Sequence, residues 1–204
     1  TVKTTFSKNV LADIGFFGAM YDASFPSYKH PVLVSSVDGV GTKLKIAFAM
    51  KRYNTVGQDL VNHCVNDIAV CGAAPLYFMD YFATGKLSST ITENVINGFA
   101  KACKENSCSL IGGETAEMPG FYKTGEFDIA GMIVGVVEKK NIINGKSITK
   151  GDILIGLPST GLHTNGYSLA RAVLQKIPLT KKLSSQQTLS DTLLAVHQIG
   201  RASC

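Results

Sequence analysis

The chain has 204 residues, 45% of them apolar, and a mean hydropathy of +0.15, which predicts a globular protein with a sizeable core in one domain or two. The formal net charge is +5, but no basic stripe is interleaved with aromatic residues, so nucleic acid is not an expected partner. No apolar run reaches 18 residues and the five cysteines form no Cys-x-x-Cys pair, which argues against a membrane span and a zinc site and for reduced thiols in the cytoplasm.

The first clear element is an apolar, β-branched strand that starts at Val32. It is followed by a polar loop, which is expected at the edge of the sheet. This loop contains Asp38, Gly39, Gly41, Thr42 and Lys43. Glycines let a backbone approach a ligand closely, a carboxylate suits a hard cation, and a lysine offsets phosphate charge. We interpret the segment as a phosphate-and-metal loop. An ordinary hairpin turn with a solvated aspartate is the alternative, because two-glycine loops are common.

A helix is predicted over residues 56–71, with Thr55 at its N-cap. Apolar side chains recur at helical spacing along one face and indicate the core side. The opposite flank carries only short polar side chains, namely Asp59, Asn62, His63, Asn66 and Asp67. Solvated faces usually carry long flexible charges, so this flank favours a positioned site. A solvent face that happens to be short and polar is the alternative.

The chain then alternates between strands and one further helix. Residues 76–83 form an aromatic-rich strand, and Thr90 and Glu93 match a capping box for a helix over residues 91–106. A short strand over residues 108–111 ends at the glycines that precede Glu114. An apolar strand over residues 127–137 follows, and then a polar connector. This order predicts an α+β fold with a mixed β-sheet.

A second unit begins near Gly151, with a strand predicted over residues 152–158. After it comes a loop rich in hydroxyl groups and glycines that leads into a helix. Unpaired N–H groups at a helix N-terminus attract anions. The candidate anion-binding residues are Ser159, Gly161, His163, Asn165 and Gly166. A capped helix start with a surface histidine is the alternative.

Four motifs together resemble one enzyme family, the phosphoribosylformylglycinamidine cyclo-ligases, also called aminoimidazole ribonucleotide synthetases. The order and spacing match in Asp38-Gly39-Val40-Gly41-Thr42-Lys43, in Asp67 to Pro75, in Gly112-Gly113-Glu114-Thr115-Ala116-Glu117-Met118-Pro119, and in Ser159 to Gly166. The resemblance covers about residues 1–195. Residues 196–204 depart from it, where a Pro-Thr-Arg-like segment is expected.

The resemblance implies an ATP-dependent ring closure in de novo purine biosynthesis, in which formylglycinamidine ribonucleotide becomes aminoimidazole ribonucleotide. The cofactors it implies are ATP and Mg²⁺, and the enzyme it implies is a cytoplasmic homodimer whose N-terminal sheets pair into a barrel. Residues 1–150 then form an ATP-binding and dimerisation domain, and residues 151–204 are the start of a truncated C-terminal α/β domain. Such a fragment is expected to be inactive alone. A non-catalytic ATP-binding or dimerisation module of the same superfamily is the alternative.

The same resemblance implies roles for individual residues, although none of them is assigned as catalytic. Three acids, which would repel one another without a cation, are implied to hold Mg-ATP: Asp38, Asp67 and Glu114. Lys43 is implied to contact phosphate, and Gly39, Gly41, Thr42 and Gly113 complete the nucleotide set. The loop residues Ser159, Gly161, His163, Asn165 and Gly166 are implied to bind the substrate's phosphate. Asp59 fits the family pattern, but its role stays open.

Four of the cysteines are predicted to be buried or half-buried thiols: Cys64, Cys71, Cys103 and Cys108. Cys64 and Cys71 lie two turns apart on one predicted helix, a separation of about 10 Å that is beyond disulfide reach. Cys103 and Cys108 straddle a helix end and could approach each other.

Overall fold

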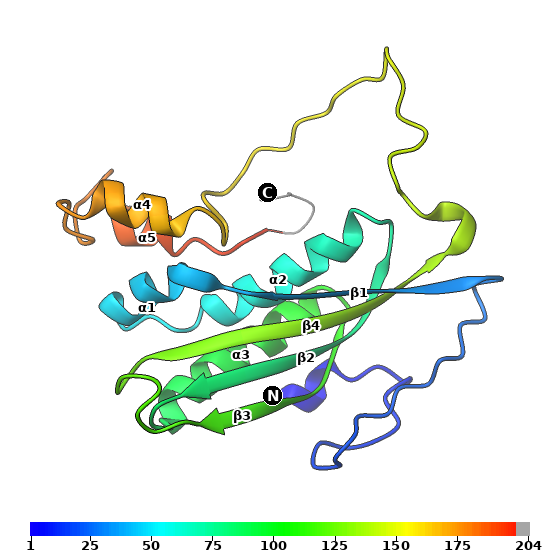
Figure 1. Cartoon of the computed structure of the whole chain (residues 1–204), viewed down its shortest axis with the longest axis horizontal. Helices are drawn as coiled ribbons and strands as arrows, with labels where there is room; N and C mark the ends of the chain where they lie inside the picture. The colour runs from blue at the N-terminus through cyan, green and yellow to red at the C-terminus, as the bar shows by residue number, and fades with distance from the viewer. Residues whose placement is uncertain (199–204) are drawn as a thin grey trace.

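The structure is a computed structural model that describes residues 1–198, and it contains a four-stranded mixed sheet (Figure 1). The spatial order of the strands is β1-β4-β2-β3. The β2 and β3 strands run parallel, and the other two pairs are antiparallel, as the predicted mixed sheet requires. The bounds are β1 (Pro31–Gly39), β2 (Ala74–Thr84), β3 (Ser109–Glu117) and β4 (Phe127–Glu138).

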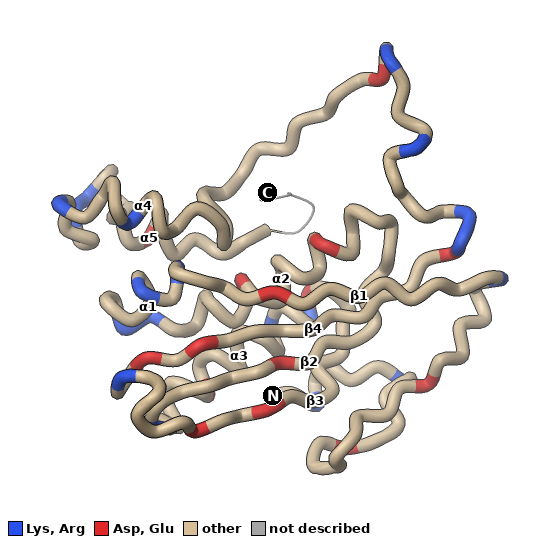
Figure 2. The backbone as a smooth tube through the Cα atoms, in the orientation of Figure 1, with Lys and Arg blue, Asp and Glu red and all other residues tan. Residues whose placement is uncertain are grey.

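Two long helices cover one face of this sheet, and the other face carries no helix among residues 1–198 (Figure 1). The covering helices are α2 (Val56–Ala69) and α3 (Ser89–Glu105). The shorter helices are α1 (Leu44–Met50), α4 (Tyr167–Leu174) and α5 (Leu189–Leu193), with 3₁₀ turns η1 (Val2–Thr5), η2 (Gly41–Lys43) and η3 (Lys139–Asn141). Lys and Arg residues are spread along the chain over many of these elements (Figure 2). No described helix is long and apolar enough to cross a membrane.

The core lies between the sheet and the two long helices. Its largest members are fully buried, and they include Phe78, Phe82, Phe99, Ile129 and Ile133. The described cysteines are free thiols: Cys64, Cys103 and Cys108 are buried and Cys71 is half-buried, which confirms the thiol prediction for these four. Cys204 lies outside the described residues. Because the apolar face of α2 packs in this core, its polar flank lies outside the core, beside the edge strand β1.

Strand β3 is longer than the sequence predicts. It does not end at the glycines but stays paired with β2 as far as Glu117. Glycines inside a strand often mark a close approach of neighbouring groups. A Cβ atom on Gly113 would lie 2.4 Å from Oδ1 of Asp80, so the glycine makes room for that carboxylate rather than forming a turn.

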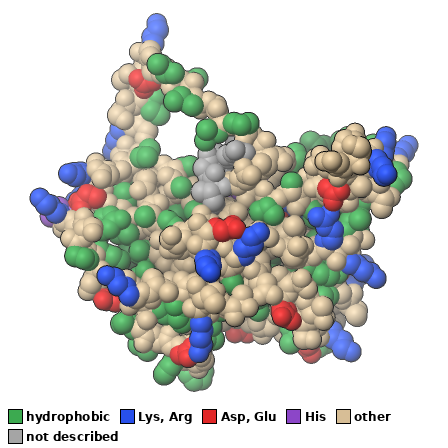
Figure 3. Space-filling model, turned by 180° about the vertical axis from the view of Figure 1, so that it is seen from behind, with side chains coloured by type: hydrophobic (Ala, Val, Ile, Leu, Met, Phe, Trp, Pro, Cys, Tyr) green, Lys and Arg blue, Asp and Glu red, His purple; other side chains and the backbone are tan. Residues whose placement is uncertain are grey.

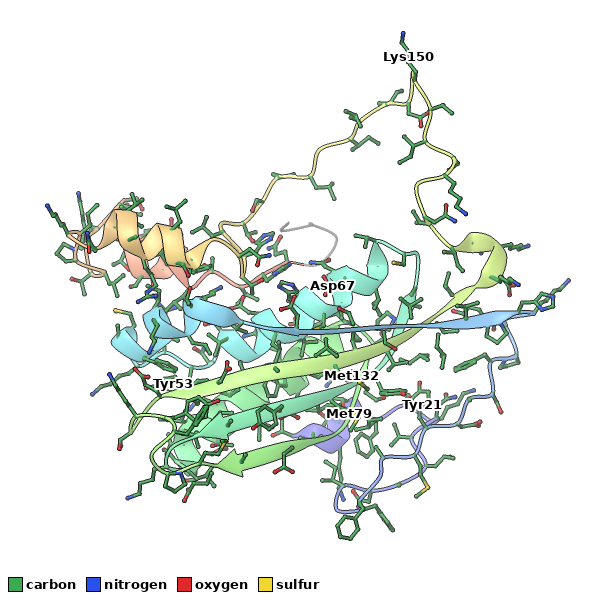
Figure 4. The ribbon with its side chains drawn as sticks, in the orientation of Figure 1. Tyr21, Tyr53, Asp67, Met79, Met132 and Lys150 are labelled. Carbon is green, nitrogen blue, oxygen red and sulfur yellow. The ribbon has the colours of Figure 1, made fainter. Side chains whose placement is uncertain are left out.

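Two further local predictions are wrong. The N-cap of α3 is Ser88 rather than Thr90, which lies inside the helix, and no side-chain capping bond forms. Residues 152–158 form no strand, because no described segment supplies the backbone partners that a strand requires. They belong to a long connection that projects from the body of the molecule, with Lys150 at its tip (Figure 4). Figure 3 shows hydrophobic side chains along this connection, where Ile153 and Leu154 are exposed.

Residues 159–198 return to the body and pack on the side of α1 and α2. Helix α4 contacts η2, and α5 contacts α1. Thr55 is the N-cap of α2, as predicted, but its side chain makes no capping hydrogen bond. The polar flank of α2 and the loop before α4 therefore face each other, although about 100 residues separate them in the sequence.

Candidate functional site

The polar flank of α2 is buried, so it is not a solvent face. Asp59, Asn62, His63 and Asn66 are buried and Asp67 is half-buried. The flank lies beneath the loop before α4 and the segment 195–198. Figure 4 shows Asp67 on the part of α2 nearest the C-terminal end of the described chain.

Asp38, His63 and Asp67 bring three potential metal ligands together. The Nε2 atom of His63 lies 2.8 Å from Oδ2 of Asp38 and 3.8 Å from Oδ1 of Asp67. The three ligand atoms all lie within 4.8 Å of one another. His63 and Asp67 share a face of α2 because they are four residues apart, and Asp38 comes from the end of β1. The hydroxyl of Ser36 donates a hydrogen bond of 2.7 Å to the second oxygen of Asp67 and fixes that carboxylate.

These donors fit a divalent cation. Two carboxylates are typical ligands for Mg²⁺ or Mn²⁺, and an imidazole is compatible with several first-row ions. Asp38 is about half exposed, so an ion can reach the group from solvent.

Glu114 does not join this group within one chain. The strand register aligns Glu114 with Tyr81, then with Ala130, and then with Gly39. Three strand spacings of about 4.8 Å therefore separate Glu114 from the end of β1, a distance of about 14 Å. Asp38 and Glu114 lie on opposite edges of the sheet, because the strand order places β1 at one edge and β3 at the other.

Lys43 was predicted to contact phosphate from an open loop. The structure does not support this, because its side chain is 0% exposed. Its Nζ lies 2.8 Å from Oδ2 of Asp59 and donates hydrogen bonds to the carbonyl oxygens of His163 and Ala195. Burial lowers the pKa of Lys43 and raises the pKa of Asp59 to about 6. The ion pair thus gives Asp59 a role, since it neutralises Lys43 and ties η2 to the later part of the chain.

The loop before α4 leads into a helix as predicted, but His163 is not the surface histidine of the alternative interpretation. Its ring is buried and stacks on His197 with ring centroids 4.3 Å apart. Its Nε2 lies 3.3 Å from the hydroxyl of Ser159 and 3.0 Å from that of Thr160. Gly161, Asn165 and Gly166 stay exposed around it. Gly166 is the N-cap of α4 with a φ of 77°, a conformation that glycine adopts easily.

His63 links the cation group to this loop. Its Nδ1 makes a short hydrogen bond with the hydroxyl of Thr164, and its Nε2 points at the two carboxylates. On the other side of the loop, Thr42 and Ser168 hydroxyls lie 3.1 Å apart. The predicted nucleotide loop and the predicted phosphate loop are therefore neighbours in space.

The segment 195–198, which was not predicted as part of the site, covers the rest of the polar flank. The backbone N–H of His197 donates to Asp59, and Asn62 donates to the carbonyl oxygen of His197. Asn66 donates to the carbonyl oxygen of Gln198. The short amide side chains on α2 were the available signal, because buried amides need partners. Their partner could not be identified, since it lies more than 130 residues away.

Comparison with known proteins identifies the family. A family model described as AIR synthase related protein, N-terminal domain, matches residues 22–137. A phosphoribosylformylglycinamidine cyclo-ligase of Thermodesulfovibrio yellowstonii is 59% identical over 173 residues, which are 85% of this chain and 50% of that protein. The cyclo-ligase of Clostridium tetani is 52% identical over 200 residues, covering 97% of this chain and 60% of that protein. The chain thus spans about half of the length of these relatives.

Solved structures of related fold are more distant. E. coli HypE, a hydrogenase maturation protein, superposes with a TM-score of 0.59 at 18% identity, covering 94% of this chain and 57% of that one. Thiamine-monophosphate kinase from Stenotrophomonas maltophilia K279a gives a TM-score of 0.59 at 17% identity, with coverages of 94% and 56%. These likenesses show the fold alone. The family model, which matches more than half of the chain, shows that the chain belongs to the AIR synthase related family and carries its N-terminal domain.

Proposed function

We propose that this chain is the N-terminal part of a phosphoribosylformylglycinamidine cyclo-ligase, which closes formylglycinamidine ribonucleotide to aminoimidazole ribonucleotide with ATP. The observation that carries the proposal is the identity of 51–60% to proteins of that name along most of the chain. Residues 1–150 form the ATP-binding and dimerisation domain, and residues 151–204 begin the second domain. The activity is proposed for the whole parent enzyme, because the chain spans only about half of the length of these relatives.

In this proposal Asp38 and Asp67 hold Mg²⁺ together with ATP beside Gly39, Gly41 and Thr42. When bound, the cation neutralises phosphate charge during phosphoryl transfer. Ser36 holds the Asp67 carboxylate by its hydrogen bond. Lys43 is left out of the set of phosphate contacts, because Asp59 and two carbonyl oxygens already occupy its ammonium group.

The loop before α4 binds the ribose phosphate of the substrate. Ser159, Gly161, Asn165 and Gly166 surround the N-terminus of α4, where free N–H groups favour an anion. His163 is a positioning residue here, because its ring is buried and holds the shape of the loop through Ser159 and Thr160.

The enzyme is a homodimer, which pairs the helix-free faces of two sheets. This face carries exposed apolar side chains, including Leu33 and Val37 on β1 and Tyr81 on β2. Glu114 shares the face with Tyr81, its neighbour in the register, and Gly113 lies beside it. Gly113 and Glu114 can therefore bind nucleotide at the Asp38 and Asp67 site only if one subunit contributes them to the site of its partner.

Binding of Mg-ATP by the 204-residue chain tests the nucleotide part of the proposal. Calorimetric titration should show Mg-dependent ATP binding, and Asp67→Asn should weaken it by about tenfold or more, equivalent to about 1.4 kcal/mol. Glu93→Gln is the matched control, because Glu93 is an exposed acid on α3. Unchanged ATP affinity in Asp67→Asn would remove Asp67 from the site.

The parent enzyme tests the reaction itself. Formation of ADP that depends on formylglycinamidine ribonucleotide supports the cyclo-ligase. The alternative, a non-catalytic ATP-binding or dimerisation module, predicts nucleotide binding with no substrate-dependent ADP from the parent.

A further inference from the structure

The imidazole of His63 lies where a third metal ligand would be. We propose that His63 completes the Asp38 and Asp67 pair as a site with one nitrogen and two oxygen donors, and that without nucleotide this site binds a borderline first-row ion such as Mn²⁺ or Zn²⁺ more tightly than Mg²⁺. The inference deepens the proposed function, because it rests on the same two carboxylates. It adds a ligand that the family resemblance did not assign and a choice of metal that follows from that ligand.

The separations allow one ion to touch all three groups. Two donors that each lie about 2.1 Å from an ion can be at most about 4.2 Å apart. The Nε2 atom of His63 meets that limit with both carboxylates, at 2.8 Å and 3.8 Å. All three atoms fall within 4.8 Å of one another, so a small rotation of Asp38 closes the remaining gap. The Asp38 side chain is 45% exposed, and its Oδ1 accepts a hydrogen bond of 2.6 Å from the backbone N–H of Gly39, which the rotation would have to break.

Two neighbouring hydroxyl groups orient the other two ligands. Thr164 engages Nδ1 of His63, which leaves Nε2 directed at the carboxylates, and Ser36 holds Asp67. The His63 side chain is only 5% exposed, so it cannot swing into solvent. Metal-binding histidines usually have their second ring nitrogen held in this way, which fixes the ring before the ion arrives.

The donor set decides which ion is preferred. Mg²⁺ favours oxygen ligands and keeps several waters, whereas imidazole is a good ligand for zinc and other first-row ions. An ion bound here takes the place of the direct contact between Nε2 and Oδ2 of Asp38. The competing interpretation is a hydrogen-bonded trio in which His63 only orients Asp38.

Titration of the full 204-residue chain with single metal ions separates these interpretations. Free Mn²⁺ is followed by electron paramagnetic resonance, and Mg²⁺ and Zn²⁺ are measured by competition. Wild-type chain should bind Mn²⁺ and Zn²⁺ at least tenfold more tightly than Mg²⁺. His63→Gln should weaken Mn²⁺ and Zn²⁺ binding by at least tenfold and Mg²⁺ binding by less than threefold. Equal losses for all ions, or no loss, would overturn the inference.

Two variants keep this result distinct from failure of the proposed function. His30→Gln, at an exposed histidine, is the matched control and should leave every affinity unchanged. Asp67→Asn should weaken all ions. If Asp67→Asn leaves all ions unaffected, the shared carboxylate site fails and both proposals fall. If Asp67→Asn acts but His63→Gln does not, only the role of His63 is overturned.

A measurement on the wild-type chain covers the case in which His63→Gln does not fold. With ¹⁵N-labelled histidine, addition of Zn²⁺ should shift the Nε2 resonance of one buried imidazole and leave that of His30 unchanged. Assignment of the shifted resonance uses His163→Gln and His197→Gln, which remove the other two buried imidazoles and should leave the Zn²⁺-dependent signal in place. A Zn²⁺ titration that shifts no buried imidazole would overturn the inference.

Discussion

Lys43 shows how burial changes the meaning of a charged residue. Its ammonium group and the Asp59 carboxylate are both 0% exposed, and each compensates the desolvation of the other. Lys43→Met should therefore destabilise the chain by about 3–5 kcal/mol, because it leaves Asp59 buried without its counter-ion. The double variant Lys43→Met/Asp59→Leu should recover most of that loss. Urea unfolding of the two variants measures both effects.

The control for this prediction is Lys45→Met, because Lys45 and Glu126 form an exposed ion pair. Exposed pairs contribute about 0–1 kcal/mol, so this variant should unfold close to wild type. A Lys43→Met chain as stable as Lys45→Met would show that the buried pair does not stabilise the fold.

Asp80 should make stability depend on pH. It lies on β2 between the buried residues Phe78 and Phe82, and burial raises its pKa from 3.8 to about 7. The folded chain therefore holds this proton more tightly than the unfolded chain does, and stability falls as pH rises from about 4 to 7. Asp80→Asn should be more stable than wild type at pH 8, by about 1 kcal/mol or more, and similar at pH 4.

Thermal unfolding by circular dichroism at the two pH values checks this sign. Glu93→Gln, an acid-to-amide change at an exposed site, should leave the pH dependence unchanged. If Asp80→Asn is less stable than wild type at pH 8, the carboxylate makes a favourable interaction that outweighs its burial.

At the level of single residues, the sequence was most informative where neighbours share a helix. His63 and Asp67 come together because of helical spacing, which can be predicted. The surroundings of Lys43 and Glu114 could not be predicted in this way, because segments far away in the sequence determine them. The acceptors of Lys43 come from residues 163 and 195, and the position of Glu114 depends on which strand lies at each edge of the sheet.

The packing of α2 on α3 depends on two glycines that face each other. A Cβ atom on Gly57 would lie 2.3 Å from the carbonyl oxygen of Val95, and one on Gly98 would lie 3.1 Å from Cα of Gly57. Gly57→Ala should therefore push the helices apart and cost about 1–3 kcal/mol, the range for overpacking. Gly18→Ala is the control, because no atom lies within 4 Å of that Cβ position.

Chemical denaturation of both variants checks this effect, with Gly57→Ala expected to unfold at lower urea than wild type and Gly18→Ala unchanged. Equal midpoints for all three proteins would mean that the helix pair can relax without loss. Because α2 also carries His63 and Asp67, a shift of α2 should weaken cation binding as well.

Among the elements, helices and apolar strands were predicted well from periodicity, and their ends less well. β1, α2, β2 and β4 are present where the sequence indicates them. The glycines before Glu114 were interpreted as a strand end, yet they serve the close approach of Asp80. The strand predicted over residues 152–158 failed for another reason, since apolar composition alone does not supply a neighbouring strand.

At the scale of the whole molecule, the two faces of the sheet are unequal. One face is covered by α2 and α3, and the other presents the neighbouring side chains Met79 and Met132, which are labelled in Figure 4. Val37 pairs with Met132 in the register and is 67% exposed. The mixed sheet was predictable from the sequence. Which apolar side chains remain uncovered was not, because that depends on strand order and on where the helices pack.

The proposed dimer can be tested at this open face. If two sheets pair through it, Val37→Arg places a charge in an apolar interface and should convert a dimer into a monomer without lowering thermal stability. Sedimentation velocity over a range of concentrations measures the state of association. Val173→Arg is the control, because Val173 is an equally exposed valine on α4, outside the sheet. A wild-type chain that stays monomeric, or dimers that persist in Val37→Arg, would count against this face as the interface. Glu114 would then have no route to the cation site of a second copy, and the nucleotide set would reduce to the residues that β1, η2 and α2 bring together.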